Sequence, residues 1–219
     1  MLAYLVWQAV TWPDVAALAE EPPETTAFIE RYRRRAARSD RPEPRHTWVP
    51  MSRISRHLGH AVVVAEDMEF FSHDGFSRHE LRVALEDAWE EKSLPRGAST
   101  ISQQLAKNLW LSPSYNPLRK LEEALLTWQL ERQLSKRRIL ELYLNVVEFG
   151  PGVYGAEAAA RHYYGQSAAG LSRQQAAALA AGLSRPSQWH PGVETRGYQR
   201  RVATIVARMR QAQWVAREL

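Results

Sequence analysis

Two short stretches carry polar side chains in patterns that could do chemistry, Glu66–Gly75 and Gly97–Asn108. In the first stretch, acidic residues follow the apolar run 61–65 and precede two phenylalanines. A carboxylate held against apolar groups has a raised pKa, which suits a general base near neutral pH. Glu66 is therefore our candidate base. The alternative is a helix end whose acidic side chains are simply solvated.

The second stretch predicts a helix with amide groups and an ammonium on one face, supplied by Gln103, Gln104, Lys107 and Asn108. Such a face could bind a pyrophosphate, with the lysine as a point charge. Ser99 and Thr100 lie where this helix should begin, and free N–H groups at a helix start also favour anions. Thr100 and Gln103 have the spacing of a capping box as well. The alternative is a polar face exposed to solvent.

A second candidate carboxylate, Glu123, follows Arg119 by four residues and Lys120 by three. Residues at these spacings share a helix face, and two cations favour the ionised carboxylate. Glu66 in an apolar setting and Glu123 in a cationic one would then differ in protonation, as acid and base pairs in enzymes often do. An ordinary salt bridge on a helix would give the same pattern at Glu123.

The elements that position these residues should be helices, because apolar spacing is helical and no stretch alternates strictly. We expect a mainly α fold. A buried helix over 54–71 should deliver Glu66 near its C-terminal end, with Gly75 closing it. Ser77 and Glu80 form a capping box that should open a helix to about residue 92. The other predicted helices span 25–39, 100–111, 118–134, 136–148, 154–164, 172–183 and 196–217, and the helix over 118–134 carries an apolar stripe of Leu118, Leu121, Leu125 and Trp128.

The first 45 residues differ in composition from the rest. Residues 1–10 are apolar but shorter than the roughly 20 residues that span a bilayer. Prolines at 22–23 and at 42 and 44 interrupt the chain, and five arginines gather between them, at 31, 33, 34, 35 and 38. That cluster could attract anionic headgroups or could be a solvated face. We expect a membrane-proximal segment and linker over 1–45 and a catalytic domain over 46–219.

Composition excludes little else. The chain has 219 residues, a formal net charge of +5 and no cysteine. The absence of cysteine rules out disulfides and thiolate metal sites. The modest basic excess is compatible with anionic lipid, pyrophosphate or nucleic acid and does not choose among them.

Four ordered motifs are more specific. They are Glu-Asp-x-x-Phe-x-x-His-x-Gly at 66–75, Gly-x-Ser-Thr-x-x-Gln-Gln-x-x-Lys-Asn at 97–108, Arg-Lys-x-x-Glu at 119–123 and Lys-x-x-Ile-Leu-Glu-x-Tyr-Leu-Asn at 136–145. With them the chain resembles the peptidoglycan glycosyltransferase family, in particular its monofunctional biosynthetic members. The resemblance covers roughly residues 48–191. It implies an α-helical, lysozyme-like fold of two lobes around a central cleft.

The resemblance also implies an activity: polymerisation of lipid II into β-1,4 glycan strands by inverting displacement of undecaprenyl pyrophosphate, without transpeptidase activity. Glu66 would deprotonate the acceptor hydroxyl, and Glu123 would help at the donor. Lys107, Arg119 and Lys120 would steady the pyrophosphate, while Ser99, Thr100, Gln103, Gln104 and Asn108 would orient sugar and phosphates. The motif-supporting residues would be Asp67, Phe70, His73, Gly75, Glu131, Glu141, Tyr143 and Asn145.

The implied location is the periplasmic face of the bacterial inner membrane, with anchoring by an N-terminal helix that is incomplete in this chain. The implied partners are lipid II, the growing lipid-linked glycan, the membrane surface and proteins of cell-wall synthesis or division. No nucleic-acid partner is expected. No metal site is assigned, although Mg²⁺ or Mn²⁺ could be required. Asp67, Glu69 and His73 could help to hold such an ion, or could instead fix the Glu66 loop by hydrogen bonds.

The chain departs from the family pattern at two positions. Tyr115 stands where many members have arginine, so the donor site could depend more on Arg119 or Arg96. Thr127 replaces a small apolar residue, which we expect to be tolerated. Two rival functions remain: a lysozyme-like lytic enzyme that cleaves glycan, and a non-catalytic, basic helical membrane-binding protein.

Overall fold

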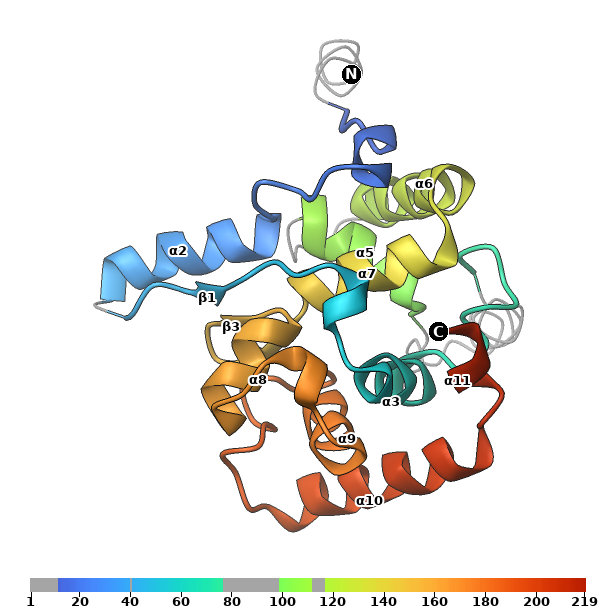
Figure 1. Cartoon of the computed structure of the whole chain (residues 1–219). Helices are drawn as coiled ribbons and strands as arrows, with labels where there is room; N and C mark the ends of the chain where they lie inside the picture. Colours follow the sequence, from blue (N-terminus) through green and yellow to red (C-terminus); the bar gives the residue numbers. More distant parts are fainter. Residues whose placement is uncertain (1–11, 40, 77–98, 112–116) are drawn as a thin grey trace, which may run out of the picture.

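The computed structural model describes residues 12–39, 41–76, 99–111 and 117–219. The expected mainly α, lysozyme-like fold is confirmed (Figure 1). The described helices are α2 (Ala27–Ser39), α3 (Arg56–Glu66), α5 (Ile101–Trp110), α6 (Pro117–Gln133), α7 (Lys136–Val146), α8 (Ala156–Tyr164), α9 (Arg173–Gly182), α10 (Arg196–Gln211) and α11 (Val215–Glu218). The single helix predicted over 196–217 is thus two helices, because the chain leaves helical geometry at Ala212.

A small sheet was not predicted. Its strands β1 (Arg45–His46), β2 (Glu148–Gly150) and β3 (Val153–Tyr154) lie in the order β1-β3-β2, with β1 parallel and β2 antiparallel to β3. Strands of two or three residues are too short to show alternation in a sequence. Gly155, which follows β3, has φ of +84°, and a Cβ there would lie 2.5 Å from the carbonyl oxygen of Asn145. This position therefore requires glycine.

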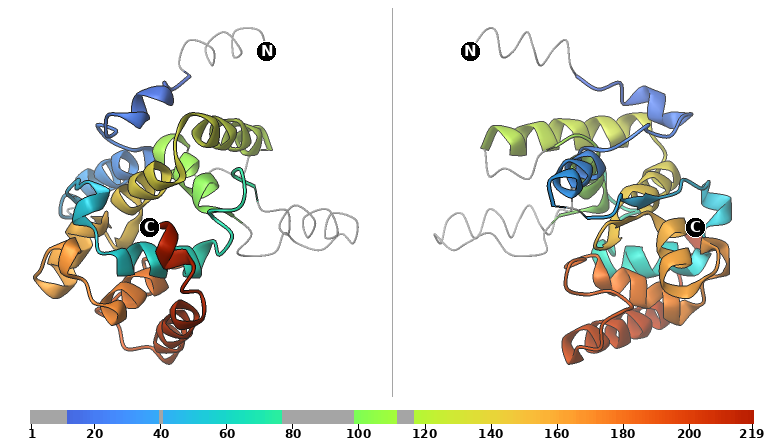
Figure 2. Two further views of the ribbon diagram at one scale, coloured as in Figure 1. Left: turned by 45° about the vertical axis from the view of Figure 1, so that its right-hand side comes forward. Right: turned by 90° about the vertical axis from the view of Figure 1, so that its left-hand side faces the viewer.

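The helices pack in two groups. α3 packs against α9 and α10, while α5 packs against α6 and α7. The two groups lie at the bottom and the top of Figure 1, and the views of Figure 2 keep them apart in the same way. Glu66 ends α3, and a side chain of α5 donates a hydrogen bond to it. The candidate site therefore lies where the two groups meet.

The helix that delivers Glu66 ends earlier than predicted. α3 stops at Glu66, and Asp67 has left helical geometry with φ of −161° and ψ of 80°. The predicted end at residue 71 was wrong. Phe70 is fully buried although it lies in the turn that follows. Its burial imitates the apolar period of a longer helix, so the sequence pattern could not mark the true end.

Helix α6 has two apolar faces. One face is buried and carries Leu126 and Leu130 beside Glu123 and Thr127. The stripe seen in the sequence lies on the other face, and its side chains are exposed: Leu118 55%, Leu121 58%, Leu125 46% and Trp128 49%. Spacing predicted the stripe correctly, but it is not a core face.

The described part of the N-terminal segment contacts the rest of the protein. Trp12 Nε1 donates a hydrogen bond of 2.7 Å to Gln129 Oε1 on α6, and α2 packs against α5. The division at residue 45 stays a prediction. Among the described residues, no helix is both long and apolar enough to cross a membrane. The apolar segment 1–10, the predicted helix over 77–92, Arg96 and Tyr115 lie outside the described residues.

Candidate active site

Glu66 lies at the centre of the candidate site, with only 10% of its side chain exposed. Gln104 Nε2 donates to Glu66 Oε2 at 3.0 Å, and Arg201 Nη2 lies 3.6 Å from Glu66 Oε1. Burial raises the pKa of Glu66, although the Gln104 amide and the Arg201 guanidinium partly offset this increase. A carboxylate with a raised pKa can accept a proton near neutral pH. The prediction from the apolar setting of Glu66 is therefore supported by its pKa direction.

The orientation of the Gln104 side-chain amide is fixed by hydrogen bonds to residues other than Glu66. Tyr143 donates its hydroxyl proton to Gln104 Oε1 at 2.8 Å, and Gln104 Nε2 also lies 3.2 Å from the carbonyl oxygen of Ser99. The amide must therefore present its NH₂ group to Glu66. In the structure the Gln104 amide donates to the candidate base, and its predicted substrate-binding role stays a prediction.

The loop after Glu66 is held by Asp67, His73 and Gly75. Gly75 N donates to His73 Nδ1 at 3.0 Å, so the other ring nitrogen carries the proton and donates to Asp67, with Nε2 3.0 Å from Oδ1. Asp67 Oδ2 also accepts from the backbone N–H of Ile101 at 2.9 Å. These bonds connect the end of α3 to the start of α5.

The start of α5, which the sequence suggested as an anion site, has several of its polar groups engaged within the protein. Thr100 and Gln103 form the expected capping box, and the N–H group of Ile101 is taken by Asp67. Thr100 is buried and donates its hydroxyl to the carbonyl oxygen of Gly75 at 2.7 Å. The N–H groups of Ile101 and Gln103 are therefore engaged within the protein, and an anion-binding role of this helix start stays a prediction. A substrate-binding role for Thr100 and Gln103 stays a prediction.

Glu123 is buried on α6 among cations, as its spacing predicted. Arg119 Nη1 lies 3.0 Å from Glu123 Oε2, and Lys120 pairs with the other carboxylate oxygen. Thr127 donates its hydroxyl to the carbonyl oxygen of Glu123 at 2.7 Å, which satisfies the polar group that this buried position contains. The expected tolerance of threonine there therefore has a structural reason.

Lys107 connects the two carboxylates electrostatically. Burial lowers the pKa of Lys107, while the charges of Glu123 and Glu66 raise it and those of Lys120 and Arg119 lower it further. Lys107 and Asn108 lie on α5, with Asn108 buried. Two cations, Arg119 and Lys120, pair with Glu123, and Lys107 on α5 is close enough to be influenced by the same charges; the predicted pyrophosphate-binding role of the three is not tested.

Comparison with known proteins identifies the family to which the chain belongs. The sequence profile described as Transglycosylase matches residues 32–210. The chain belongs to the transglycosylase family. Proteins named biosynthetic peptidoglycan transglycosylase are similar to it: one from Methylobacillus flagellatus is 50% identical over 89% of this chain and 85% of its own length. Another, from Dechloromonas aromatica, is 44% identical over 94% of this chain and 90% of its own length. The predicted family is confirmed.

Most motif-supporting residues of this transglycosylase have structural contacts. Asn145 is fully buried and exchanges hydrogen bonds with the backbone of Val49, at 3.0 and 2.9 Å. Glu141 accepts from the backbone N–H of Met51 at 2.8 Å. Glu131 pairs with Lys136 at 2.8 Å, and that ammonium lies 4.7 Å from the ring centroid of Phe70. These residues hold the loops and helices around the site.

The sequence missed Arg201. This residue lies on α10, beyond the four motifs, and donates to the carbonyl oxygen of Ala65 at 3.0 Å as well as approaching Glu66. Its Nε is buried without a hydrogen-bond partner among the described residues. Its pair with Glu66 joins residues 135 positions apart, so no local spacing could have revealed it.

Two of the possible metal ligands, Asp67 and His73, form hydrogen bonds that hold the loop after Glu66. Both ring nitrogens of His73 have protein partners, and Asp67 accepts from His73 and Ile101. Within the part of the chain that the structure describes, no group of three or more His, Asp or Glu side chains is arranged to hold a metal ion. Dependence on Mg²⁺ or Mn²⁺ is untested.

Proposed function

We propose that this transglycosylase polymerises lipid II into β-1,4 glycan strands, with the lipid-linked growing chain as the donor. The single observation that carries the proposal is the arrangement of two largely buried carboxylates: Glu66, whose pKa burial raises, and Glu123, which is ion-paired with Arg119 and Lys120, with Lys107 under the influence of both. The names of its relatives support the same reaction class.

Each group has a defined role in the proposed reaction. Glu66 takes the proton of the acceptor hydroxyl, and the acceptor oxygen forms a bond to the anomeric carbon of the donor as the bond to undecaprenyl pyrophosphate breaks. One displacement converts the α linkage of the donor into the β linkage of the product. The leaving group is an anion, so Lys107, Arg119 and Lys120 stabilise charge there rather than supply a proton.

The cation cluster also separates this reaction from its closest rival. A lytic enzyme cleaves a glycosidic bond between sugars, whose leaving group carries no pyrophosphate. Two cations paired with one carboxylate, and a third under its influence, favour a donor that brings several negative charges. Incubation with labelled lipid II tests the proposal. Long glycan is the expected product; cleavage of preformed glycan, or no reaction with either substrate, would contradict it.

We further propose that the protein acts on the membrane surface through α6. The exposed stripe defined above gives three leucines and a tryptophan on one face, and the Arg132 guanidinium lies 5.1 Å from the Trp128 ring centroid. An amphipathic aromatic ring beside a cation suits the boundary between headgroups and acyl chains. Trp12 bonds to Gln129 of α6, and the short 3₁₀ helix that follows, Ala16–Ala19, also packs against α6 (Figures 1 and 2).

Flotation with anionic vesicles tests this surface. The variant Leu121→Glu with Leu125→Glu should release most of the protein from the vesicles, because charges replace inserted apolar groups. The matched control, Gln188→Glu with Gln211→Glu, adds the same two negative charges at exposed positions elsewhere and should float like the parent. Deletion of residues 1–12 measures the separate share of the N-terminal segment. If the stripe variant floats like the parent at low and high salt, α6 is not the membrane-contacting surface.

A further inference from the structure

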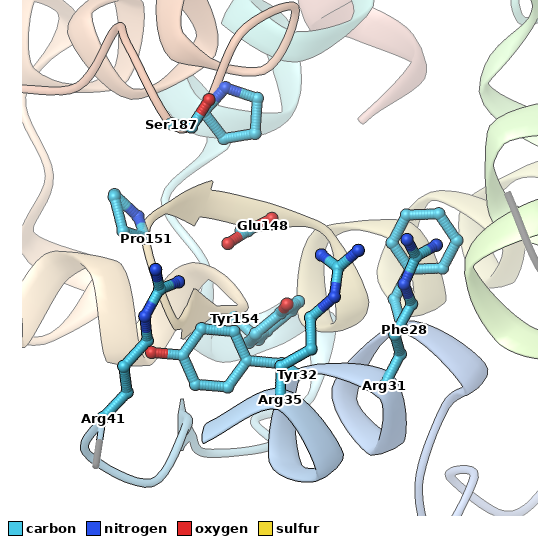
Figure 3. Close-up of a pocket in the computed structure, with 10 residues that line it drawn as sticks. Phe28, Arg31, Tyr32, Arg35, Arg41, Glu148, Pro151, Tyr154 and Ser187 are labelled. Carbon is cyan, nitrogen blue, oxygen red and sulfur yellow. The ribbon is translucent and has the colours of Figure 1, made fainter. Parts of the chain in front are cut away.

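A cavity lies away from the residues assigned to the reaction, between α2, the β2–β3 turn and the loop after α9 (Figure 3). Its volume is about 340 Å³, at the small end of the range for ligand sites. None of its lining residues belongs to the cluster around Glu66 and Glu123. The five-arginine cluster noted in the sequence contributes two residues to this cavity, Arg31 and Arg35, and the loop before β1 adds Arg41.

The three arginines of the cavity form no ion pair with the described residues, and Glu148 is the one acidic residue among the described residues of the lining. By contrast, Arg33 on α2 pairs with Glu30 at 2.6 Å. Figure 3 shows the Arg31, Arg35 and Arg41 side chains around the cavity with Glu148 between its two sides. Three guanidinium groups and one carboxylate leave the cavity positive whatever the protonation state of Glu148.

One carboxylate oxygen of Glu148 accepts a hydrogen bond from within the protein. Its Oε1 accepts from the backbone N–H of Gly152 at 3.1 Å. Burial raises the pKa of Glu148, while that hydrogen bond and the charge of Arg35 lower it. The other carboxylate oxygen accepts no hydrogen bond from the described residues and is available to a hydroxyl group of a ligand.

The walls of the cavity are aromatic and prolyl. Tyr32 and Tyr154 meet edge to face with ring centroids 6.0 Å apart, and Pro151 and Pro186 add flat apolar surface. Gly152 has φ of +72°, and a Cβ there would lie 2.4 Å from the Tyr32 hydroxyl, so the backbone passes close to this ring. Such walls suit a compact body with apolar and hydroxyl-bearing faces.

We propose that this cavity is a ligand site of the protein, for a small anion whose carboxylate or phosphate lies at Arg35, with Arg31 and Arg41 adding positive charge on either side, and whose hydroxyl-bearing body lies against Tyr32 and Pro186. The proposal goes beyond the polymerisation reaction. Two sources could offer this chemistry: a small sugar that carries a free carboxylate, or a glycerol phosphate headgroup of the membrane.

Isothermal titration of the full chain distinguishes these sources. The probes are N-acetylmuramic acid for the carboxylated sugar and glycerol 1-phosphate for the headgroup, with N-acetylglucosamine as a neutral control. One or both anions should bind, and the neutral sugar should bind at least about 10-fold more weakly, because a hydrogen bond to a charged group contributes about 1.5–3 kcal/mol. The anion that binds more tightly identifies the source. Absence of binding by both anions at millimolar concentration overturns the proposal.

The variant Arg35→Gln should weaken anion binding about 10-fold or more, by the same reasoning. The matched control is Arg34→Gln, which removes the same charge from an exposed position of the same helix outside the cavity, and it should bind like the parent. Equal losses in the two variants would mean that binding follows overall charge, and would overturn the proposal.

Glu148→Gln provides a test that keeps all three arginines. Binding of inorganic phosphate, which has no hydroxyl-bearing body to reach Glu148, should be unchanged or tighter after this removal of a negative charge, whereas a cavity built for a cation would lose its ligand. Weaker binding of inorganic phosphate to a folded Glu148→Gln protein would overturn the proposal. None of these binding measurements depends on lipid II turnover, so failure of the proposed reaction would be seen separately.

Discussion

The two carboxylates of the site, Glu66 and Glu123, are both largely buried, but their negative charges are compensated to different extents. Glu66 ends α3 and receives one amide hydrogen bond, with its guanidinium partner at 3.6 Å. Glu123 lies within α6 and pairs with Arg119 at 3.0 Å and with Lys120. One carboxylate is thus held with little compensation of its charge, and the other is surrounded by cations.

This difference suits two tasks. Incomplete compensation keeps Glu66 ready to take a proton, since a proton relieves the cost of burying its charge. The cations around Glu123 leave a positive region beside it, where a departing anion can be stabilised. In the proposed reaction, one glutamate serves as the base and the other holds the cations that stabilise the leaving group.

Loss of the Glu66 carboxylate should have the largest effect. Glu66→Gln keeps the shape and removes the base, so lipid II polymerisation should fall by about 10² to 10⁴, the usual range for general base catalysis. The variant should be at least as stable as the parent at neutral pH. The raised pKa means that the folded state binds the proton more tightly than the unfolded state, so the charged form costs stability as pH rises.

Asp74→Asn is the matched control for this prediction, because Asp74 is an exposed acid of the same loop. It should polymerise like the parent. A folded Glu66→Gln protein that polymerises near the parent rate would remove Glu66 from the reaction, and thermal unfolding as a function of pH checks the stability prediction separately.

Loss of one cation beside Glu123 should cost less. Lys107→Ala should reduce turnover about 10²-fold, the effect of removing one group that stabilises charge in a transition state. It should also weaken binding of phosphoglycolipid inhibitors such as moenomycin, which resemble the donor. Lys107→Arg keeps the charge and should recover part of both. Unchanged inhibitor affinity in Lys107→Ala, measured in detergent, would exclude Lys107 from the phosphate site.

The sequence predicted the cationic half of this comparison well. Arg119 and Lys120 reach Glu123 through helical spacing alone, and the capping box at Thr100 follows from four consecutive residues. Local geometry determines both, so pattern reasoning was sufficient.

The surroundings of Glu66 were predicted less completely than those of Glu123. Its partners Gln104 and Arg201 come from α5 and α10, and the bond from Tyr143 that orients Gln104 comes from α7. These contacts depend on how helices pack, which one sequence does not specify. The end of α3 was placed five residues too late for a related reason: Phe70 is buried by tertiary packing rather than by helical period. On α6, spacing detected an apolar stripe but could not tell which of two apolar faces meets the core.

Gly75, in the loop after Glu66, lies against α6, the helix that carries Glu123. Substitution of Gly75 should reduce the stability of the fold more than it reduces lipid II polymerisation. Gly75 has φ of +90°, and a Cβ would lie 2.9 Å from both Thr127 and Glu131 of α6. Gly75→Ala should therefore destabilise the fold by about 1–3 kcal/mol, as expected for a side chain forced into a rare backbone conformation. Gly165→Ala is the control: it has φ of +64° but open space around its Cβ, so it should cost less. Equal losses in chemical denaturation would mean that backbone conformation alone, and not contact with α6, makes Gly75 necessary.

The smallest expected effect tests how Arg201 tunes Glu66. Burial is the main cause of the raised pKa of Glu66, and among the offsetting groups are Gln104, Arg201 and Lys107, while Asp67 raises it further. Arg201→Gln removes one group that lowers this pKa, so the pKa should rise. The base would then be protonated over a wider range, and the acidic limb of the kcat/KM profile should move to higher pH while the plateau stays near that of the parent.

Two further variants separate the charge of Arg201 from its support of the fold. Arg208→Gln is the matched control, because Arg208 also lies on α10 and donates to the backbone of α3, at Val64, without an ion pair to Glu66. Arg201→Lys keeps the charge and should bring the acidic limb back towards that of the parent if charge is the cause. A uniform fall of kcat/KM at every pH in Arg201→Gln would indicate that Arg201 only supports the fold through its bond to Ala65. A limb that moves to lower pH would contradict its effect on Glu66, since loss of a nearby positive charge can only favour the protonated carboxyl.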